Sequence, residues 1–354
     1  MLDAVADLVS IESPTADLAA VRRVVEHTEA WLTARLGSAP EVVVREGRPH
    51  LLWNGARPGV VIVGHLDTVW PLGTLERWPF SVADGRATGP GVFDMKAGVV
   101  IAAEAIASLA DPGRVALLLT TDEETGSPTS RALVEETVRG CRAALVCEPP
   151  QNGAVKTARK GVGMYTVAVT GRAAHAGLEP ENGVNATVEL AHQVLAVTAL
   201  NDPAHGTTVT PTVAASGTVG NTVPPSATVY VDVRATSATA LDEVDRALRG
   251  LAPVLPGARV ELLGGVNRPP LERAMAIGLY ELAVDAATEA GIEGLAECMV
   301  GGGSDGNFTA GIGVPTLDGL GAVGGGAHAE GEWIDVAELP RRAAMLAGLL
   351  RRLT

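Results

Sequence analysis

The clearest indication of the fold is Val60-Val-Ile-Val-Gly-His-Leu-Asp67, which joins a continuously apolar, β-branched run to a histidine and a carboxylate. Such a run is typical of a strand that is buried on both faces in a parallel sheet. Two further apolar runs, Val115–Leu119 and Ala143–Val146, also end at acidic residues. Because parallel strands end at one edge of a sheet, we expect five side chains to gather there: His65, Asp67, Glu123, Glu124 and Glu148.

Helical segments alternate with these runs up to about residue 160. Apolar residues recur at helical spacing over residues 17–36, 96–109 and 130–138. This alternation predicts a sheet covered by helices on both faces. Beyond residue 160 the order changes to strand-helix-strand-strand-helix-strand, which is typical of a ferredoxin-like α+β unit. The segments expected there are residues 162–170, 185–200, 207–213, 227–233, 240–251 and 259–263.

We therefore predict an α/β protein with two domains, a number that suits 354 residues. The catalytic domain has a mixed, mostly parallel sheet between helices and is discontinuous in sequence, comprising residues 1–160 and 269–354. An inserted ferredoxin-like α+β domain occupies residues 161–268.

Composition excludes several classes of partner. The chain has 27 Lys and Arg against 41 Asp and Glu, so its formal net charge is −14. This balance argues against nucleic acid and anionic membranes, which both need a basic surface. Its three cysteines indicate no disulfide framework, and its acidic start is unlike a secretory signal. We expect a cytoplasmic protein that acts on small molecules.

Two glycine-flanked stretches add further candidate ligands. Gly89-Pro-Gly-Val-Phe-Asp94 places a carboxylate before a helix, and Gly324-Gly-Gly-Ala-His328 presents a histidine. Each residue taken alone is more typical of a helix cap or a strand end. Two histidines and several carboxylates at one sheet edge, however, need cations to balance their charge. Imidazole with carboxylate suits Zn²⁺, with Co²⁺ or Mn²⁺ as substitutes, and the Asp67 carboxylate is placed to accept the second N–H of His65.

The chain resembles a family of two-zinc amidohydrolases. The family includes glutamate carboxypeptidase, acetylornithine deacetylase, succinyl-diaminopimelate desuccinylase and the aminoacylases, and the folate-cleaving glutamate carboxypeptidases are most similar. Six segments carry the resemblance in order: Gly64-His-Leu-Asp-Thr-Val69, Gly89-Pro-Gly-Val-Phe-Asp94, Thr121-Asp-Glu-Glu-Thr-Gly-Ser127, Gly171-Arg-Ala-Ala-His-Ala-Gly177, Gly220-Asn-Thr-Val-Pro-Pro225 and Gly301-Gly-Gly-Ser-Asp305.

The resemblance implies two Zn²⁺ ions per chain. His65 and Glu148 would hold one ion, Glu124 and His328 the other, and Asp94 would bridge them. Glu123 would be the general base that takes a proton from the attacking water. In many relatives a second Asp follows the bridging aspartate across a cis peptide bond, whereas Met95 follows here.

The resemblance also assigns roles outside the metal centre. His175 would reach into the active site of a partner subunit and stabilise the oxyanion, so the inserted domain is expected to act as a lid and to form a homodimer. Asn221 and Arg234 would contact a substrate carboxylate, together with backbone N–H groups of Gly302 and Gly303.

The resulting prediction is a zinc-dependent hydrolase that cleaves an amide bond next to a free carboxylate. The carboxypeptidase form would release a C-terminal amino acid, with glutamate as a candidate. The alternative is an N-acyl-amino-acid deacylase, which needs the same catalytic residues. A binding protein that has lost catalysis is disfavoured, because every ligand position, the base and the oxyanion histidine are present.

Overall fold

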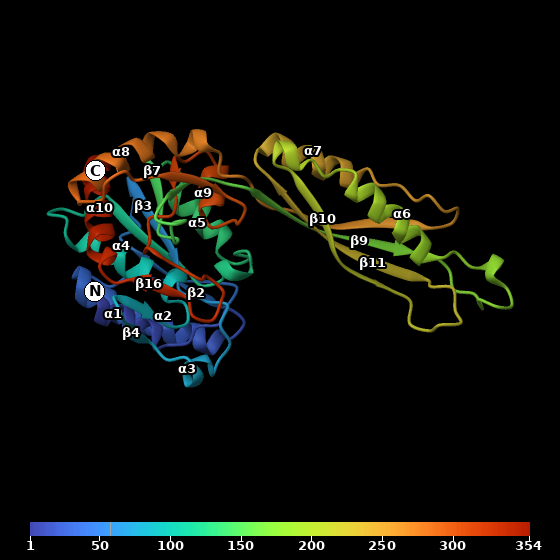
Figure 1. Cartoon of the computed structure of the whole chain (residues 1–354), viewed down its shortest axis with the longest axis horizontal. Coiled ribbons are helices and arrows are strands. Elements are labelled where there is room, and N and C mark those ends of the chain that lie inside the picture. The colour runs from blue at the N-terminus through green and yellow to red at the C-terminus, as the bar shows by residue number, and fades with distance from the viewer. Residues whose placement is uncertain (57) are drawn as a thin grey trace. The chain divides into compact units, whose positions relative to one another are not determined.

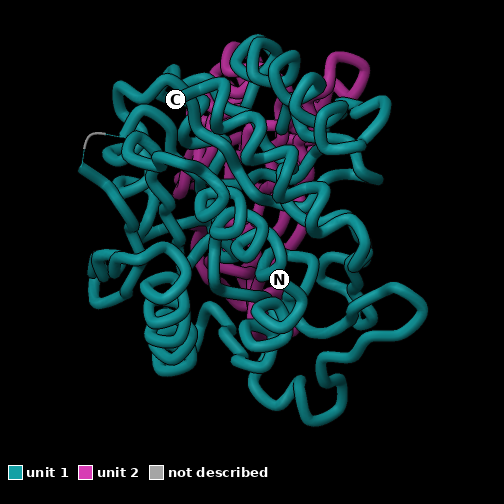
Figure 2. The backbone as a smooth tube through the Cα atoms, turned by 90° about the vertical axis from the view of Figure 1, so that its left-hand side faces the viewer, with its two compact units in different colours: residues 1–159, 271–354 teal, residues 160–270 magenta. Residues whose placement is uncertain are grey.

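The computed structural model describes residues 1–56 and 58–354. They form two compact units, shown in different colours in Figure 2. Unit 1 comprises residues 1–159 and 271–354, and unit 2 comprises residues 160–270. No helix within the described residues combines the length and apolar character needed to cross a bilayer.

A six-stranded mixed sheet forms the centre of unit 1 (Figure 1). Its strand order is β1-β2-β6-β3-β7-β14. Strand β3 pairs in parallel with both β6 and β7, and β14 pairs in parallel with β7, whereas β1 and β2 are antiparallel. The predicted mixed, mostly parallel sheet is confirmed. The strands are β1 (Glu41–Arg45), β2 (Arg48–Trp53), β3 (Val60–His65), β6 (Val115–Thr120), β7 (Ala143–Val146) and β14 (Thr316–Leu317).

The apolar runs of the sheet are continuous because each face packs against its own core. In β3, Val60 and Ile62 belong to one core, and Val61 and Val63 to the other. Helices α1 (Leu2–Val9), α2 (Leu18–Leu36), α4 (Ala97–Ala107), α8 (Ile277–Glu289) and α10 (Glu338–Leu353) contribute to the first core. Helices α5 (Arg131–Val138) and α9 (Gly306–Gly311) contribute to the second. Every β3 side chain is therefore buried.

Capping residues set the ends of the predicted helices. The carboxylate of Asp17 accepts the Ala20 N–H at 2.8 Å at the start of α2, and Gly37 ends that helix with a φ of 78°. Glycine adopts this left-handed conformation without the steric cost of a Cβ atom. In unit 2, Asn185 caps helix α6 (Ala186–Thr198) by accepting the N–H of Thr187.

The remaining elements of unit 1 are short and lie outside the six-stranded sheet. A small sheet has the order β15-β16-β5-β4, and β8 pairs in parallel with β13. These elements are α3 (Thr74–Arg77), β4 (Ser81–Ala83), β5 (Arg86–Thr88), η1 (Val92–Lys96), η2 (Glu123–Thr125), β8 (Val155–Arg159), η5 (Arg273–Met275), β13 (Glu297–Val300), β15 (Gly324–Gly325) and β16 (Trp333–Asp335).

Unit 2 is an antiparallel four-stranded sheet with the order β10-β11-β9-β12. Helices α6 and α7 (Ala238–Arg249) lie along one face of it (Figure 1), and their apolar side chains share a core with alternate residues of β9 and β11. This is the expected ferredoxin-like arrangement. The remaining elements are β9 (Gly161–Thr170), η3 (Pro180–Asn182), η4 (Pro203–His205), β10 (Thr208–Ser216), β11 (Ser226–Ala235) and β12 (Arg259–Arg268).

Candidate metal centre

The carboxyl edge of the unit 1 sheet brings together side chains from five separate segments. His65 is the last residue of β3, and Glu148 lies two residues beyond β7. Glu124 lies in the short helix η2 that follows β6, and Asp94 lies in η1. His328 lies in the turn between β15 and β16, with a φ of 62°.

Asp94 lies between the two histidines, and each of its oxygens faces a different imidazole. Its Oδ1 is 3.3 Å from Nε2 of His65, and its Oδ2 is 3.3 Å from Nε2 of His328. A second carboxylate approaches each histidine: Glu148 Oε1 lies 3.5 Å from His65, and Glu124 Oε2 lies 3.2 Å from His328. The result is two sets of imidazole and carboxylate that share Asp94.

Asp67 organises this edge through its carboxylate, but not by the expected contact with His65. The Nδ1 atom of His65 lies 2.9 Å from the backbone oxygen of Asp67, whereas the Asp67 Oδ1 atom is 3.6 Å away. The fully buried carboxylate instead accepts the Thr15 hydroxyl at 2.7 Å and the backbone N–H groups of Glu123 and Glu124 at 3.3 and 3.2 Å. The backbone of residue 67 thus orients His65, and its side chain holds η2 in place.

Opposite charges in this cluster change the protonation of its members. Burial disfavours a charged His65, but hydrogen bonds to Asp94 and Glu148 outweigh it and raise its pKa well above the ordinary value. Hydrogen bonds to Asp94 and Glu124 raise the pKa of His328 to about 10. Burial opposes ionisation of Asp94, yet its bonds to both histidines lower its pKa. The carboxylates therefore favour the protonated, positively charged form of both imidazoles.

The donor set fits divalent metal ions. One oxygen of Glu124, Oε1, is buried and has no hydrogen-bond partner among the described residues. Such an atom costs free energy unless a cation or donor meets it. Ligand atoms of His65, Asp94 and Glu124 lie within 4.8 Å of one another. Imidazole nitrogens and carboxylate oxygens at these positions are the ligands that zinc takes.

Glu123 belongs to the same cluster. It is 9% exposed, and a carboxylate oxygen lies within 4.8 Å of ligand atoms of both His65 and Glu148. Its backbone is fixed through Asp67. The peptide bond between Asp94 and Met95 is cis, and the Met95 side chain is buried beside Gly64 and Gly98.

Three predicted residues outside the metal-ligand set come from the inserted part of the chain. His175, Asn221 and Arg234 all belong to unit 2. His175 is exposed, and its Nδ1 atom accepts the Gly177 N–H at 3.1 Å, while Asn221 is exposed and accepts the Ala176 N–H through its backbone oxygen. The guanidinium of Arg234 donates two hydrogen bonds, of 2.9 and 2.8 Å, to Asp232.

Two residues near the metal centre escaped the sequence analysis, Arg159 and Asp318. Buried Arg159 donates to Asp318 at 2.6 Å and to Glu148 at 3.4 Å. It also donates to the carbonyl oxygens of Gly302 and Gly303, at 3.0 and 3.2 Å. Asp318 directly follows β14, and several of the other candidate acids also follow strands. A strand of two residues, however, has too few apolar positions to be recognised in the sequence.

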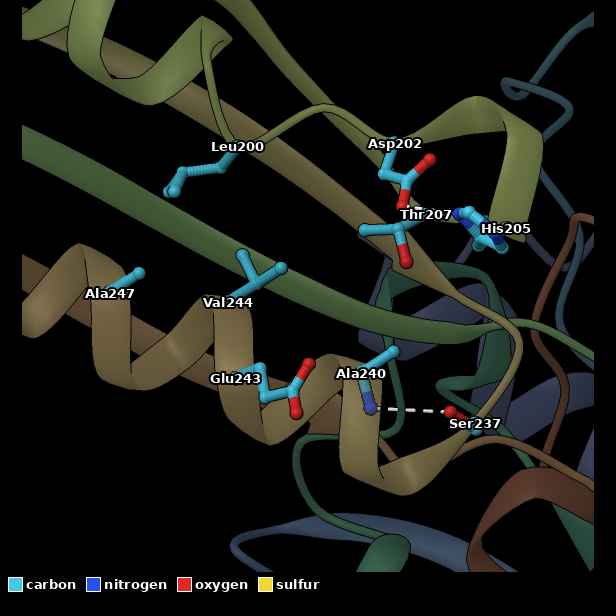
Figure 3. A pocket seen from close by; sticks show the side chains of 9 residues that line it. All are labelled: Leu200, Asp202, His205, Thr207, Ser237, Ala240, Glu243, Val244 and Ala247. Carbon is cyan, nitrogen blue, oxygen red and sulfur yellow. Dashed lines mark hydrogen bonds and ion pairs between the residues drawn. The ribbon is translucent and has the colours of Figure 1, made fainter.

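A surface pocket of unit 2 shows a different chemistry (Figure 3). It lies between α7 and the segment around η4, where Asp202 and His205 form a 2.7 Å contact with each other. Leu200 and Val244 supply apolar lining, and both His205 and Asp202 have more than half of their side-chain surface exposed. None of the predicted site residues lines this pocket.

A comparison with protein-family models agrees with the resemblance to the two-zinc hydrolases. Residues 61–352 match the model of peptidase family M20/M25/M40. The chain belongs to the M20 peptidase family. It is therefore a metallopeptidase or amidohydrolase of that family, in agreement with the sequence prediction.

Individual relatives cover most of the chain. It is 32% identical to carboxypeptidase G2 of Pseudomonas sp. (strain RS-16), over 97% of this chain and 86% of the relative. It is 29% identical to succinyl-diaminopimelate desuccinylase of Dechloromonas aromatica, over 90% of each chain. An M20 family metallo-carboxypeptidase from Sulfolobus solfataricus has the same fold, with a TM-score of 0.76, 16% identity and coverage of 99% of this chain and 98% of the other.

Proposed function

We propose that this M20 enzyme is a two-zinc hydrolase that cleaves an amide bond next to a free carboxylate, as a carboxypeptidase does. The observation that carries the proposal is the shared position of Asp94. Its two carboxylate oxygens lie 3.3 Å from His65 and 3.3 Å from His328, and each histidine meets a further acid. An arrangement with one carboxylate between two ligand sets suits a pair of bridged metal ions.

The ligands divide into two sets around Asp94. His65 and Glu148 would hold one ion, and Glu124 and His328 the other, in agreement with the short contacts within each pair. When bound, the two zinc ions would lower the pKa of the attacking water and polarise the scissile carbonyl. Co²⁺ or Mn²⁺ would bind the same donors.

Glu123 supplies the proton transfers. Its carboxylate lies among the ligand atoms without being needed in either set, and Asp67 holds its backbone. It would accept a proton from the attacking water and deliver that proton to the leaving amine. The low exposure of its side chain keeps bulk water from competing for that proton.

The substrate carboxylate would be recognised by Arg234 and Asn221, together with the N–H groups of Gly302 and Gly303. The fork of an arginine guanidinium matches the two oxygens of a carboxylate. In this structure the fork of Arg234 already binds a carboxylate, that of Asp232, with two parallel hydrogen bonds. A substrate carboxylate would compete with or join Asp232 at this position.

His175 would complete the active site of a second subunit in a homodimer. The resemblance places this histidine on the oxyanion, and in this chain its ring is exposed on unit 2. Mixing His175→Ala and Glu123→Ala chains tests the proposal. If subunits share sites, the mixture regains part of the activity that each variant lacks, whereas activity no higher than that of the separate variants would contradict sharing.

Deacylation is the second candidate, supported by the 29% identity to succinyl-diaminopimelate desuccinylase. A panel that sets peptides ending in glutamate against N-acyl-amino acids separates the two. We expect higher kcat/KM on the peptide series, because the 32% identity is to carboxypeptidase G2. Preference for acyl-amino acids would favour the deacylase, and esterified substrates should lose activity in either case, because they lack the free carboxylate.

Metal content tests the centre itself. About two zinc ions per chain are expected by elemental analysis, and activity lost on chelation should return with Zn²⁺, Co²⁺ or Mn²⁺. A chain that binds no metal would overturn the proposed function.

A further inference from the structure

A buried carboxylate, Glu332, joins three segments of unit 1 that lie around the metal centre. Its side chain is fully buried, although it ligates nothing in the proposed centre. Its Oε1 atom accepts the backbone N–H of Phe93 at 3.1 Å, and its Oε2 atom accepts the indole N–H of Trp70 at 3.2 Å. Both oxygens are therefore used, and each binds a different segment.

The positions of these partners along the chain make the contacts informative. Phe93 immediately precedes Asp94, and Trp70 lies in the segment that follows β3 and its terminal His65. Glu332 itself directly precedes β16, at the end of the turn that presents His328. That turn is closed by two backbone hydrogen bonds, from Ala329 to Gly326 and from Glu332 to Ala329.

We propose that Glu332 is a positioning residue that holds the His328 turn against η1 and so sets the separation of His328 from Asp94. The inference rests on the proposed two-metal function. The contact that it would control is the 3.3 Å approach of His328 Nε2 to Asp94 Oδ2. Because His328 is 52% exposed, packing around its own ring does little to fix it. A buried anchor at the base of the turn supplies the missing restraint.

The two metal positions should differ in their dependence on Glu332. His65 is 1% exposed and ends a central strand, so its position does not need the turn. His328 and Glu124 form the set that includes the turn. Loss of Glu332 should therefore weaken the ion held by His328 and Glu124 and leave the ion held by His65 and Glu148 close to its original affinity.

A competition titration with a chromogenic chelator measures both affinities in the full chain. We expect wild type to bind two zinc ions, and Glu332→Ala to bind one normally and the second roughly 10- to 100-fold more weakly. In Glu332→Gln the amide oxygen can accept only one of the two N–H groups, so a smaller loss at the same ion is expected. Glu330→Gln, on the same turn and with a 60% exposed side chain, is the matched control and should bind like wild type.

The identity of the weakened ion is tested against His328→Ala. That variant should lose the same ion, and the double variant Glu332→Ala/His328→Ala should show little further loss at it. The cobalt-substituted visible spectrum of Glu332→Ala should keep the bands that remain in His328→Ala. A simple loss of fold stability would instead affect both ions alike.

The outcomes separate this inference from the proposed function. If wild type binds two ions and Glu332→Gln also binds both like wild type, the positioning role is overturned and the function stands. Equal weakening of both ions in Glu332→Gln overturns it as well. If wild type binds no zinc, the proposed function fails first.

Discussion

The two units hold their candidate functional residues in opposite ways. In unit 1, His65, Asp67 and Glu148 are buried, and the cluster around Asp94 contains one carboxylate oxygen, Oε1 of Glu124, that has no hydrogen-bond partner among the residues the structure describes. In unit 2, His175 is exposed, and Arg234 is paired with Asp232 on a partly exposed strand. The unit 1 residues are buried, where an unbalanced charge costs solvation free energy, whereas the unit 2 residues are at least partly exposed to water.

The unit 1 assignments are supported by the energetics of burial, whereas the unit 2 assignments rest on the family resemblance. Buried carboxylates carry a cost that a cation removes, so the unit 1 cluster points to metal without reference to any relative. The exposed residues of unit 2 carry no such cost. Their proposed roles depend on a substrate carboxylate or a second subunit. Variants made separately in the two sets should therefore differ in whether they change metal content or substrate binding.

The largest effect is expected from Asp94→Asn, because Asp94 faces both histidines. Activity should fall by roughly 10⁴-fold, since the variant would lose the proposed shared ligand of both ions. Zinc content should drop toward zero by elemental analysis. Asp84→Asn, at an exposed turn, is the control and should behave like wild type. Retention of two zinc ions in Asp94→Asn would contradict the bridging role.

Glu123→Gln should abolish turnover while the metal stays bound. Loss of a general base lowers kcat by roughly 10²- to 10⁴-fold, and the amide keeps the shape of the side chain. Steady-state kinetics and zinc content measured on one preparation check this, with Glu136→Gln, whose side chain is 62% exposed, as the control. If kcat survives within threefold, Glu123 is not the base.

Arg234→Ala tests unit 2 on the same substrate. A charge-assisted hydrogen bond contributes about 1.5–3 kcal/mol, so KM should rise by roughly 10- to 100-fold with little change in kcat. Zinc content should not change. Arg246→Ala, exposed on α7, is the matched control. A loss of metal in Arg234→Ala would contradict a role for Arg234 in substrate binding alone.

The smallest effect concerns His50, a buried histidine of unit 1 that lies 3.2 Å from the Thr129 hydroxyl. Burial lowers its pKa to about 4. Above about pH 6.5 it is neutral in the folded and unfolded states, but between pH 6.5 and 4 only the unfolded chain takes the proton. The free energy of unfolding should therefore decrease as the pH is lowered through that window. At pH 5, His50 should account for about 2 kcal/mol of the decrease.

Urea unfolding at pH 8, 7 and 5 measures this contribution. His50→Gln should lose about that much less stability between pH 7 and 5 than wild type. Between pH 8 and 7 the two proteins should change in parallel, which serves as the internal control. Equal losses between pH 7 and 5 would show that His50 is not held neutral by burial.

Local pattern was enough to predict most secondary structure. The run Val60–Val63 became β3, and the helix expected over residues 17–36 is α2, bounded by Asp17 and Gly37. The hairpin of β1 and β2 was missed. Its turn, Glu46-Gly47, has positive φ at both residues, a conformation for which Asn-Gly or Asp-Gly is the usual sequence. Glutamate at the first of these positions gives no such indication.

The residues that gather at the candidate metal centre could be predicted from the sequence, but their geometry could not. His65, Glu124 and Glu148 follow apolar strands, so their place at one edge of the sheet follows from parallel pairing. The backbone oxygen of residue 67 as the partner of His65 could not be foreseen. The sequence is the same whether His65 contacts the side chain or the backbone of residue 67, so it cannot distinguish the two.

The longer helices and strands, the two-part architecture and the residue types of the candidate metal centre could be predicted from local sequence alone, because each depends on periodicity or on the end of a strand. Tertiary structure alone decided the strand order β1-β2-β6-β3-β7-β14 and the position of Asp94 between two histidines. It also decided the Glu332 contact with Phe93, which joins residues 239 positions apart. Such contacts depend on how distant segments pack, and no local pattern records that.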